Sequence, residues 1–482
     1  MAQSSPAPSH RVVWTFAISS IALFMAALDN LVVTTALPVI RQSFAAGLSE
    51  LEWIVNAYTL TFAVLLLTGA ALGDRFGRKR MFIVGLAIFT AGSAFAALSS
   101  SVNMLIAARA IQGVGGAIVT PLTLTILSAA VPKERRAVAL GLWGAVGGLA
   151  IAIGPLVGGA VAEGLAWQWI FWLNVPIGLI AIPLAMVFLT ETYGPKQRLD
   201  LPGLAIITAG LFSLVYGLVR GNDLGWDDPQ IVAALALGVV GILAFIGWEA
   251  RTREPMLPLR LFRSRTFSAA NGVSLLMYFG MFGSIFLLAQ FFQVVQHYSP
   301  FQAGLRTLPW TLMPIFAAPT AGILSTRIGT RPLIVAGMVL QAVALFWLSA
   351  IVTPTVDYAL IVPAFIVAGI GMGFYFGPMA NVVLSAVRSE EEGKASGANN
   401  AIREIGGVFG IAVLAAIFAA NGSYQTGQAY VDGMLPALRI GAVVVAVGAV
   451  VALAIGSRAR STAEVTAPSP DGGVPELDAA AA

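Results

Sequence analysis

Long apolar runs separated by short polar or charged breaks dominate the sequence. Each run is close to or above the roughly 20 residues that an α-helix needs to cross the hydrocarbon core of a bilayer. Fourteen runs are present, at residues 12–37, 50–72, 81–100, 104–130, 137–162, 167–190, 199–219, 230–248, 267–294, 302–326, 332–351, 356–386, 399–420 and 434–456. The pattern predicts an all-α integral membrane protein with 14 transmembrane helices. An even number of spans places both termini on the same side of the membrane.

Composition supports this prediction. Of 482 residues, 58% are hydrophobic and only 10% are charged, whereas about a quarter are charged in soluble domains. The first run, 12–37, is too long for the apolar core of a cleavable signal peptide and is expected to be the first span. Cysteine is absent, and the two histidines, His10 and His297, are far apart. No disulfide, metal site or cofactor is therefore expected.

The distribution of positive charge predicts the orientation. If the termini are cytoplasmic, four of the 27 lysines and arginines lie outside, two lie inside spans, and 27 − 4 − 2 = 21 lie on cytoplasmic segments. The four expected outside are Arg41, Arg220, Arg306 and Arg439. The positive-inside rule therefore places both termini in the cytoplasm. The same spread of charge along one membrane face explains the pI near 9.5 without nucleic-acid binding.

A short repeat divides the chain into two halves. DRFGRK at 74–79 and TRIGTR at 326–331 are offset by 326 − 74 = 252 residues, and each follows the second span of a block of six. Such internal repeats are typical of secondary transporters. We therefore expect two six-helix bundles with a pseudo-twofold relation, separated by an inserted helix pair. The predicted segments are 1–11 (cytoplasmic), 12–190 (first bundle), 191–266 (inserted pair and cytoplasmic loop), 267–456 (second bundle) and 457–482 (disordered cytoplasmic tail).

Five motifs carry a resemblance to a known family. They are LDNLVVTTALP (28–38), GDRFGRKR (73–80), RAIQGVGGAIVTP (109–121), GLAIAIGPLVGG (148–159) and WQWIFWLNVPIG (167–178). With them the chain resembles the major facilitator superfamily and, within it, the fourteen-span drug/proton antiporters of the EmrB/QacA type. The resemblance implies a proton-coupled antiporter of the cell membrane that exports lipophilic, cationic drugs or toxic metabolites by alternating access.

The charged loop GDRFGRKR has two interpretations. Its glycines permit a reversal too tight for residues with a Cβ, and its one acid can pair with a neighbouring cation or cap a helix. The resemblance implies a conformational latch that holds the cytoplasmic side closed, formed by Gly73, Asp74, Arg75, Gly77 and Arg78. The alternative is an ordinary positive-inside anchor, which explains the cations but neither the acid nor the paired glycines.

The fifth span carries glycines at spacings of four residues, which leave one helix face almost bare. Such faces let helices approach closely, and a proline within the span invites a kink. Tight packing alone would explain the pattern. The resemblance adds that Gly148, Gly154, Pro155, Gly158 and Gly159 form the antiporter motif of exporters.

Charges inside spans indicate functional sites because they need a partner or water. Asp29 and Arg109 lie about 12 Å and about 9 Å from the outer ends of their spans at 1.5 Å per residue, so they can meet. Such a pair can carry a proton, or it can be a static link between helices. Glu404 offers a carboxylate to a cation or proton, or else lies at the interface. Its neighbour Arg403 points about 100° away, which argues against mutual pairing.

Polar and aromatic residues within the spans are candidates for lining a substrate cavity. They are Asn30, Thr34, Tyr58, Gln112, Gln290, Gln293, Trp310, Tyr375, Asn381 and Asn400. Aromatic faces attract lipophilic cations. The expected partners are thus lipophilic small molecules, protons and the lipid bilayer. The sequence does not define an adaptor protein.

Three other functions compare differently with the sequence. An exporter dedicated to one secondary metabolite or lipid fits the same motifs, and the Ala-, Gly- and Arg-rich composition is typical of GC-rich bacterial genomes, where such exporters are common. An intramembrane enzyme is disfavoured because no nucleophile–base or metal constellation lies within the spans. An ATP-driven pump is disfavoured because no GxxxxGK[ST] motif occurs.

Overall fold

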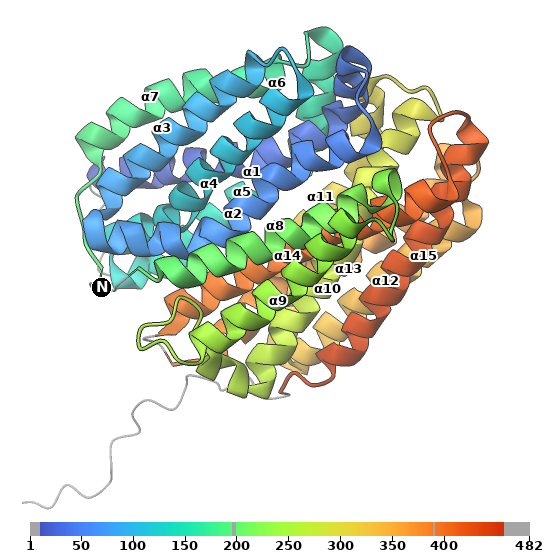
Figure 1. The fold of residues 1–482 in the computed structure, drawn as a ribbon. Coiled ribbons are helices and arrows are strands. Elements are labelled where there is room, and N and C mark those ends of the chain that lie inside the picture. The colour runs from blue at the N-terminus through green and yellow to red at the C-terminus, as the bar shows by residue number, and fades with distance from the viewer. Residues whose placement is uncertain (1–9, 195–198, 389–390, 457–482) are drawn as a thin grey trace, which may run out of the picture.

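The protein is built from helices that run side by side and are joined by short loops (Figure 1). A computed structural model describes residues 10–194, 199–388 and 391–456, apart from the side chains of a few residues such as Asn30. Within these ranges there is no strand, and 14 helical segments are long and apolar enough to cross a membrane. The predicted fold class is therefore confirmed.

The helices coincide with the predicted spans, and many extend several residues beyond them. They are α1 (His10–Phe44), α2 (Leu48–Phe76), α3 (Arg78–Ala97), α4 (Val102–Ala130), α5 (Lys133–Gly164), α6 (Trp169–Trp172), α7 (Asn174–Phe188), α8 (Leu201–Leu224), α9 (Pro229–Glu249), a 3₁₀ helix (Leu259–Arg263), α10 (Arg265–Val294), α11 (Pro300–Ile328), α12 (Thr330–Ile351), α13 (Tyr358–Ser385), α14 (Glu392–Asn421) and α15 (Gly427–Ala452). Predicted span six is divided into α6 and α7, which together form one span.

Equivalent helices pack together in the two parts of the chain. In the N-terminal half, α1 to α7, helix α4 packs against α2 and α3, and α1 packs against α5. In the C-terminal half, α10 to α15, helix α13 packs against α11 and α12, and α10 packs against α14. The two halves lie on opposite sides of the molecule, blue to teal and yellow to red in Figure 1. One large cluster of buried apolar side chains runs through both halves and joins them.

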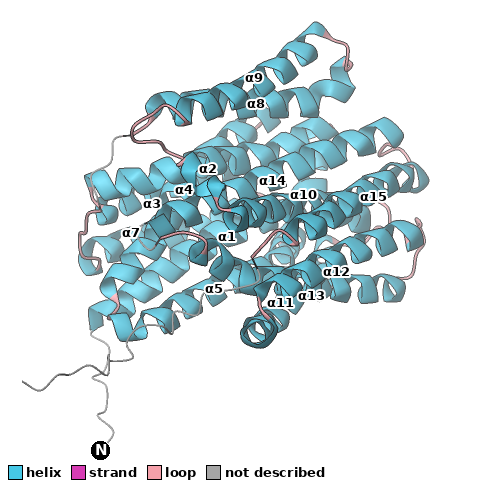
Figure 2. Ribbon diagram, turned by 90° about the horizontal axis from the view of Figure 1, so that it is seen from below, coloured by secondary structure: helices cyan, strands magenta, loops and turns pink. Residues whose placement is uncertain are grey.

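The inserted pair α8–α9 lies outside both halves (Figure 2). The two helices pack against each other, and α8 also packs against α2 and α14. The pair therefore covers one side of the junction between the halves, while α5 and α11 pack together on another side (Figure 2).

The helices end at two opposite faces of the molecule. We call the end where α1 begins the proximal face and the opposite end the distal face. The loop 73–80 lies at the proximal face, and the α1–α2 and α14–α15 connections lie at the distal face. The four cations expected in outer segments all lie inside helices: Arg41 in α1, Arg220 in α8, Arg306 in α11 and Arg439 in α15. Arg41, Arg220 and Arg306 are close to the distal ends of their helices, whereas Arg439 is further inside α15, which begins at Gly427, and its side chain is exposed.

The sequence repeat has a counterpart in backbone geometry. Gly77 and Gly329, which match in the repeat, both have positive φ, at 106° and 86°. Each closes a turn in which its N–H donates to a carbonyl four residues earlier, that of Gly73 or Ser325. These conformations are nearly restricted to glycine. Both halves therefore join their second and third spans by the same glycine-dependent reversal.

Replacing Gly329 by alanine should destabilise the fold. At φ 86° and ψ 165° a Cβ is strained by about 1–3 kcal/mol, so the temperature of thermal inactivation in detergent should fall. Gly322→Ala is the control, because a Cβ at Gly322, in the helix α11 that precedes the turn, has no neighbour within 4 Å. Equal thermal stability of the two variants would show that the turn is not strained.

Candidate transport site

A buried ion pair joins α1 to α4. Asp29 and Arg109 have 3% and 0% of their surface exposed. One terminal nitrogen of Arg109 pairs with Asp29 Oδ2 and also donates to Gln112 Oε1 at 2.9 Å. The Arg109 Nε donates to the Ile54 carbonyl of α2 at 3.2 Å. The sequence prediction that Asp29 and Arg109 meet within the spans agrees with this geometry.

Asp29 has further partners that sequence reasoning missed. Its Oδ1 accepts hydrogen bonds from Gln112 Nε2 at 3.2 Å and from Asn174 Nδ2 at 2.9 Å. The same two amides donate to the hydroxyl of Ser93, at 2.6 Å and 3.2 Å. Asn174 lies in the motif quoted for the sixth span, and its polar side chain in an apolar run was the available signal. The donors to Asp29, from α4 and α7, replace the water that the carboxylate loses on burial, and Ser93 of α3 accepts from the same two amides.

Tyr58 connects this ion pair with the opposite half. Its ring centre lies 4.3 Å from the Arg109 guanidinium carbon, and its hydroxyl donates to the Ala26 carbonyl at 3.3 Å. Tyr58 also interacts electrostatically with Asp29 and with Glu404 of α14. Tyr58 therefore lies against Arg109 and close enough to Glu404 to sense its charge across the junction.

Glu404 lies beside a cluster of aromatic residues in the C-terminal half. Arg403 places its guanidinium carbon 4.9 Å from the ring centre of Tyr278, and Tyr375 interacts electrostatically with both Arg403 and Glu404. The expectation that Arg403 and Glu404 would not pair is wrong, since their charged atoms approach to 3.9 Å. An arginine side chain is long enough to bridge the angle between adjacent helix positions.

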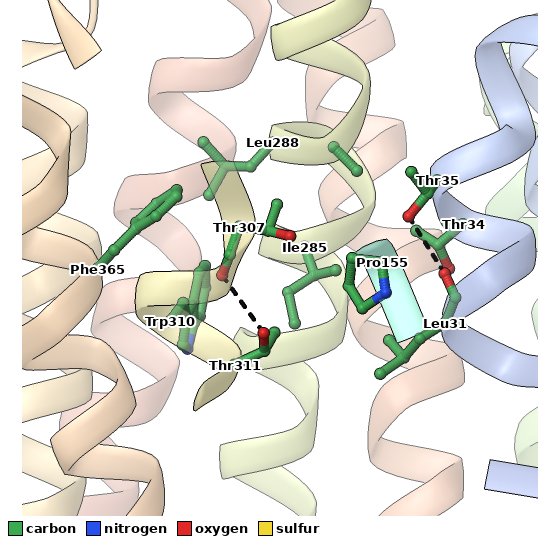
Figure 3. A pocket seen from close by; sticks show the side chains of 11 residues that line it. Leu31, Thr34, Thr35, Pro155, Ile285, Leu288, Thr307, Trp310, Thr311 and Phe365 are labelled. Atoms are coloured by element: carbon green, nitrogen blue, oxygen red, sulfur yellow. Dashed lines mark hydrogen bonds between the residues drawn. The ribbon is translucent and has the colours of Figure 1, made fainter. Parts of the chain in front are cut away.

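A pocket lies between the halves, near the distal ends of the spans (Figure 3). Its wall is mainly apolar and aromatic, with four threonines, and the ring centres of Trp310 and Phe365 lie 5.5 Å apart with the rings tilted by 45°. Within the described residues the buried Trp310 indole N–H has no hydrogen-bond partner. Leu31, Thr34 and Thr35 come from α1, Pro155 from α5, Ile285, Leu288 and Ala289 from α10, Thr307, Trp310 and Thr311 from α11, and Phe365 from α13.

The predicted cavity residues do not all line this pocket. Thr34 and Trp310 do, while Tyr58 and Gln112 belong to the Asp29 network. The others lie elsewhere: Gln293 donates to the Thr35 carbonyl, Gln290 accepts from Tyr424, Tyr375 is buried in the C-terminal half, Asn381 is exposed, and Asn400 is half-buried. The side chain of Asn30 lies outside the described residues.

Most residues of the predicted antiporter motif form a close helix–helix contact. A Cβ on Gly154 would clash with Leu31, and one on Gly158 would lie 2.7 Å from the Val32 carbonyl oxygen, so this face of α5 packs on α1. A Cβ on Gly159 would strike the Pro300 carbonyl of α11. A Cβ on Gly304 of α11 would likewise strike the Pro155 carbonyl of α5. The motif therefore brings α5 close to the opposite half as well as to its own.

Hydrogen bonds between the halves reinforce the distal contact. Gln293 donates to the Thr35 carbonyl at 2.8 Å, and Thr311 donates to the Ala152 carbonyl at 2.9 Å. The Phe301 N–H donates to Glu163 at 2.9 Å. Proximal to these contacts, a Cβ on Gly144, Gly148 or Gly322 would have no neighbour within 4 Å. Where α5 faces α11, the two halves are thus in contact at the distal face. Toward the proximal face, the glycines of these two helices have free space beside them.

The proximal loop 73–80 is held by its own half. Asp74 pairs with Arg78 at 2.7 Å, as one of the expected alternatives predicts, and Gly73 packs directly on Leu122 of α4. The side chain of Arg75 is exposed and lies 5.3 Å from the ring centre of Phe76.

Glu191, which sequence reasoning missed, anchors the same loop. Its carboxylate accepts hydrogen bonds from the backbone N–H groups of Lys79 at 2.8 Å and Arg80 at 3.2 Å. An acid at the first turn of a helix, here α3, is favourable for the helix dipole. Glu191 is more than 100 residues away in sequence, and only the polar break after span six could have indicated it.

Fourteen spans arranged as two halves, with a pocket and buried charges at their junction, define a membrane transporter. The sequence profile of the Major Facilitator Superfamily matches residues 19–411 and 270–478. The chain belongs to this superfamily.

Similar proteins include exporters of antibiotics. The chain is 34% identical to the Tetracenomycin C resistance and export protein of Streptomyces glaucescens, over 83% of this chain and 75% of that protein. It is 34% identical to the multidrug resistance protein Stp of Mycobacterium tuberculosis, over 84% and 76%. It is 33% identical to a Methylenomycin A resistance protein of Bacillus subtilis, over 87% and 90%.

Solved structures share the fold. A bacterial homologue of the human lysosomal transporter Spinster, described as inward-facing and unoccupied, superimposes with a TM-score of 0.66 at 17% identity, covering 93% of this chain and 98% of that one. A transporter of the POT family in complex with a thioalcohol-conjugated peptide gives a TM-score of 0.68 at 13% identity, covering 91% and 95%.

Gly304→Ala should open the distal face. The added methyl group overlaps the Pro155 carbonyl, and overpacking of this kind costs about 1–3 kcal/mol. Because the chain has no cysteine, spin labels on cysteines introduced at Leu165 and Phe301 report the distal separation directly. We expect a longer mean distance in Gly304→Ala and an unchanged one in Gly322→Ala. A wild-type distance in both variants would mean that this contact does not set distal closure.

Proposed function

We propose that the protein is a proton-coupled antiporter that exports lipophilic, cationic small molecules across the cell membrane. With both termini in the cytoplasm, as the distribution of lysine and arginine favours, the proximal face is cytoplasmic and the distal face is external. Export then means that substrate enters from the proximal side, binds between the halves and leaves at the distal face. The two halves act as the moving units of alternating access.

One observation carries the proton coupling: a carboxylate buried inside the spans. Asp29 is held by Arg109, which favours its ionised form, while burial favours the neutral form. A change in solvent access between conformations alters this balance. In the proposed cycle Asp29 takes a proton when its surroundings open to the outside and gives it up on the cytoplasmic side. Gln112 and Asn174 keep the carboxyl in place during both steps.

The substrate class follows from the walls of the junction. The pocket of Trp310 and Phe365 offers aromatic and apolar surface to a lipophilic molecule. Glu404, with Tyr58 and Tyr278 nearby, supplies negative charge on the proximal side of this surface. A positively charged, lipophilic molecule would be held by both features. Protonation of an acid at the junction weakens the binding of the cationic substrate. Proton uptake and substrate release are therefore coupled.

The loop 73–80 is proposed to act as the latch of the cytoplasmic face. In the present structure, which is closed at the distal face, the described partners of Asp74 and Glu191 belong to the N-terminal half. Helix α2, which leads into the loop, packs against α14, and a Cβ on Gly397 of α14 would lie 2.6 Å from Leu67. The loop thus presents an ordered, charged edge beside α14 when the cytoplasmic side closes.

An exporter dedicated to one secondary metabolite is the second candidate. The similarity to the tetracenomycin and methylenomycin proteins favours it, whereas the similarity to Stp favours a broad substrate range. A panel of drugs and aromatic polyketides, tested in an efflux-deficient bacterial host with and without an uncoupler, separates the two. Resistance to a single chemical class would support the dedicated exporter. Export that an uncoupler leaves unchanged would argue against proton coupling.

Asp29→Asn should abolish proton-driven export without preventing insertion. Asparagine keeps the shape and most hydrogen bonds of the site and removes the titrating group. Substrate-induced proton release from purified protein should be lost, whereas Asp227→Asn, at an exposed distal residue, should release protons as the wild type does. Full proton release by Asp29→Asn would exclude Asp29 as the carrier.

Asp74→Asn should favour the state that is open to the cytoplasm. In the proposed latch, the state closed to the cytoplasm adds a contact between the charged edge of Asp74 and α14, beyond the Asp74–Arg78 pair inside one half that the present structure contains. Loss of one partly exposed charged contact of that kind is worth on the order of 1 kcal/mol, about a fivefold change in population. Spin labels at Phe76 and Glu392, at the proximal ends of α2 and α14, should show a longer mean distance, and transport should be lost at normal expression. Lost transport with an unchanged distance distribution would leave the loop as a topological anchor.

A further inference from the structure

A second buried carboxylate lies near the distal face, on α2. Glu52 has 2% of its surface exposed, and its Oε2 has no hydrogen-bond partner among the described residues. Asn56, four residues further along the same helix face, is completely buried, and neither atom of its amide has a described partner. Buried polar groups normally have partners, so these three orphaned atoms call for an explanation.

The arginines near Glu52 interact with other residues. On α1, Arg41 lies over the ring of Tyr424, 3.8 Å from its centre. On α8, Arg220 donates to Asp223 at 3.3 Å and to Ser49 of α2 at 3.5 Å.

The remaining charges near this part of α2 do not neutralise Glu52 either. Arg109 of α4 is held by Asp29, and Glu50 caps the start of α2 by accepting from the Gly47 N–H. Asp223, which interacts electrostatically with Glu52, has the same sign of charge. Among the described residues Glu52 has no ion-pair partner within 4.0 Å, unlike Asp29.

Glu52 lies where the two halves meet. Tyr424, in the connection between α14 and α15, interacts electrostatically with Glu52 and donates to Gln290 of α10 at 2.7 Å. Helix α2 packs against α14 along the same junction. Tyr424 and α14, which lie on one side of Glu52, therefore belong to the C-terminal half. It moves away from Glu52 when the distal ends of the halves separate.

Burial makes the closed state sensitive to the charge of this group. An ionised carboxylate enclosed without a counterion loses its hydration and gains nothing in return, whereas the neutral acid is far less costly to bury. Separation of the halves returns water to the carboxyl and favours ionisation. Any group that binds a proton more tightly in one state shifts the equilibrium toward that state when protons are abundant.

We propose that Glu52 is the proton-binding site of the distal gate. With the distal face open, the carboxylate takes one proton from the external solution, and the halves close at this face only around the neutral acid. Closure then encloses the neutral acid, so that an empty carrier returns to face the cytoplasm only after Glu52 has taken a proton from outside, and the proton goes back to the external solution when the distal face opens again. This inference rests on the proposed proton-coupled export and assigns the external proton site, distinct from Asp29.

The test measures distal closure as a function of pH in the full-length protein in lipid nanodiscs. Spin labels at Leu165 and Phe301 report the distal distance, between about pH 5 and pH 9. In the wild type the long-distance population should grow as pH rises, because ionised Glu52 resists enclosure. Glu52→Gln, which stays neutral, should remain closed over the whole range. Glu52→Asp retains a titrating group and should restore the pH dependence.

Glu50→Gln is the matched control. It removes the same charge two residues away, and glutamine keeps the capping geometry at this position, so its pH dependence should match the wild type. A wild-type distance without pH dependence, or a Glu52→Gln profile identical to the wild type, would overturn the proposal. A pH-independent Glu52→Asp would also overturn it, by showing a purely structural role. Export that is insensitive to an uncoupler would instead contradict the proposed antiport, and the distance profiles would still decide the role of Glu52.

Discussion

Inside the hydrocarbon core of a bilayer, a charged group is stable only where protein groups replace its lost water. Asp29 illustrates this constraint. Its two oxygens are bound by a guanidinium and two amides, contributed by α4 and α7. Satisfying one carboxylate in this way fixes α1 against its neighbours and, through Arg109 and the Ile54 carbonyl, also positions α2. The packing of the N-terminal half and the proposed proton chemistry thus depend on the same few contacts.

Glycine provides the complementary freedom. At the distal ends of α5 and α11, Gly159 and Gly304 let the backbones of the two halves touch, and the hydrogen bonds of Gln293 and Thr311 lie nearby. Such contacts are made largely by backbone and short side chains, so little side-chain order is lost or gained when they separate. These contacts can separate with little loss of side-chain order, as a rocking carrier requires, while the apolar cluster that joins the halves has to rearrange.

The acids of the junction differ in what surrounds them. Asp29 is saturated with donors, Glu404 lies 3.9 Å from Arg403 beside aromatic rings, and Glu52 has no described cation partner. These surroundings suit three different tasks: holding a charge in place, meeting a cationic substrate, and responding to enclosure. A carrier that exchanges a proton for a cation benefits from such a division, because a single acid serving every step would bind both ligands in the same state.

The sequence by itself determined the all-α fold class and the number of spans, and it predicted the two halves with their inserted pair of helices and the meeting of Asp29 with Arg109. Hydrophobic run length, the glycine reversals at Gly77 and Gly329, and the rise per helix residue are local properties, and local properties are readable along the chain. Only the tertiary structure decided that Asn174 completes the Asp29 site, that Glu191 caps α3, and that Glu52 is enclosed at the junction. Each of these depends on which helix faces are turned toward each other across more than 100 residues or between helices, and periodicity within one helix does not contain that information. The apolar composition of nearly every helix makes the ambiguity worse, since a lipid-facing and a buried face have the same character in a membrane protein.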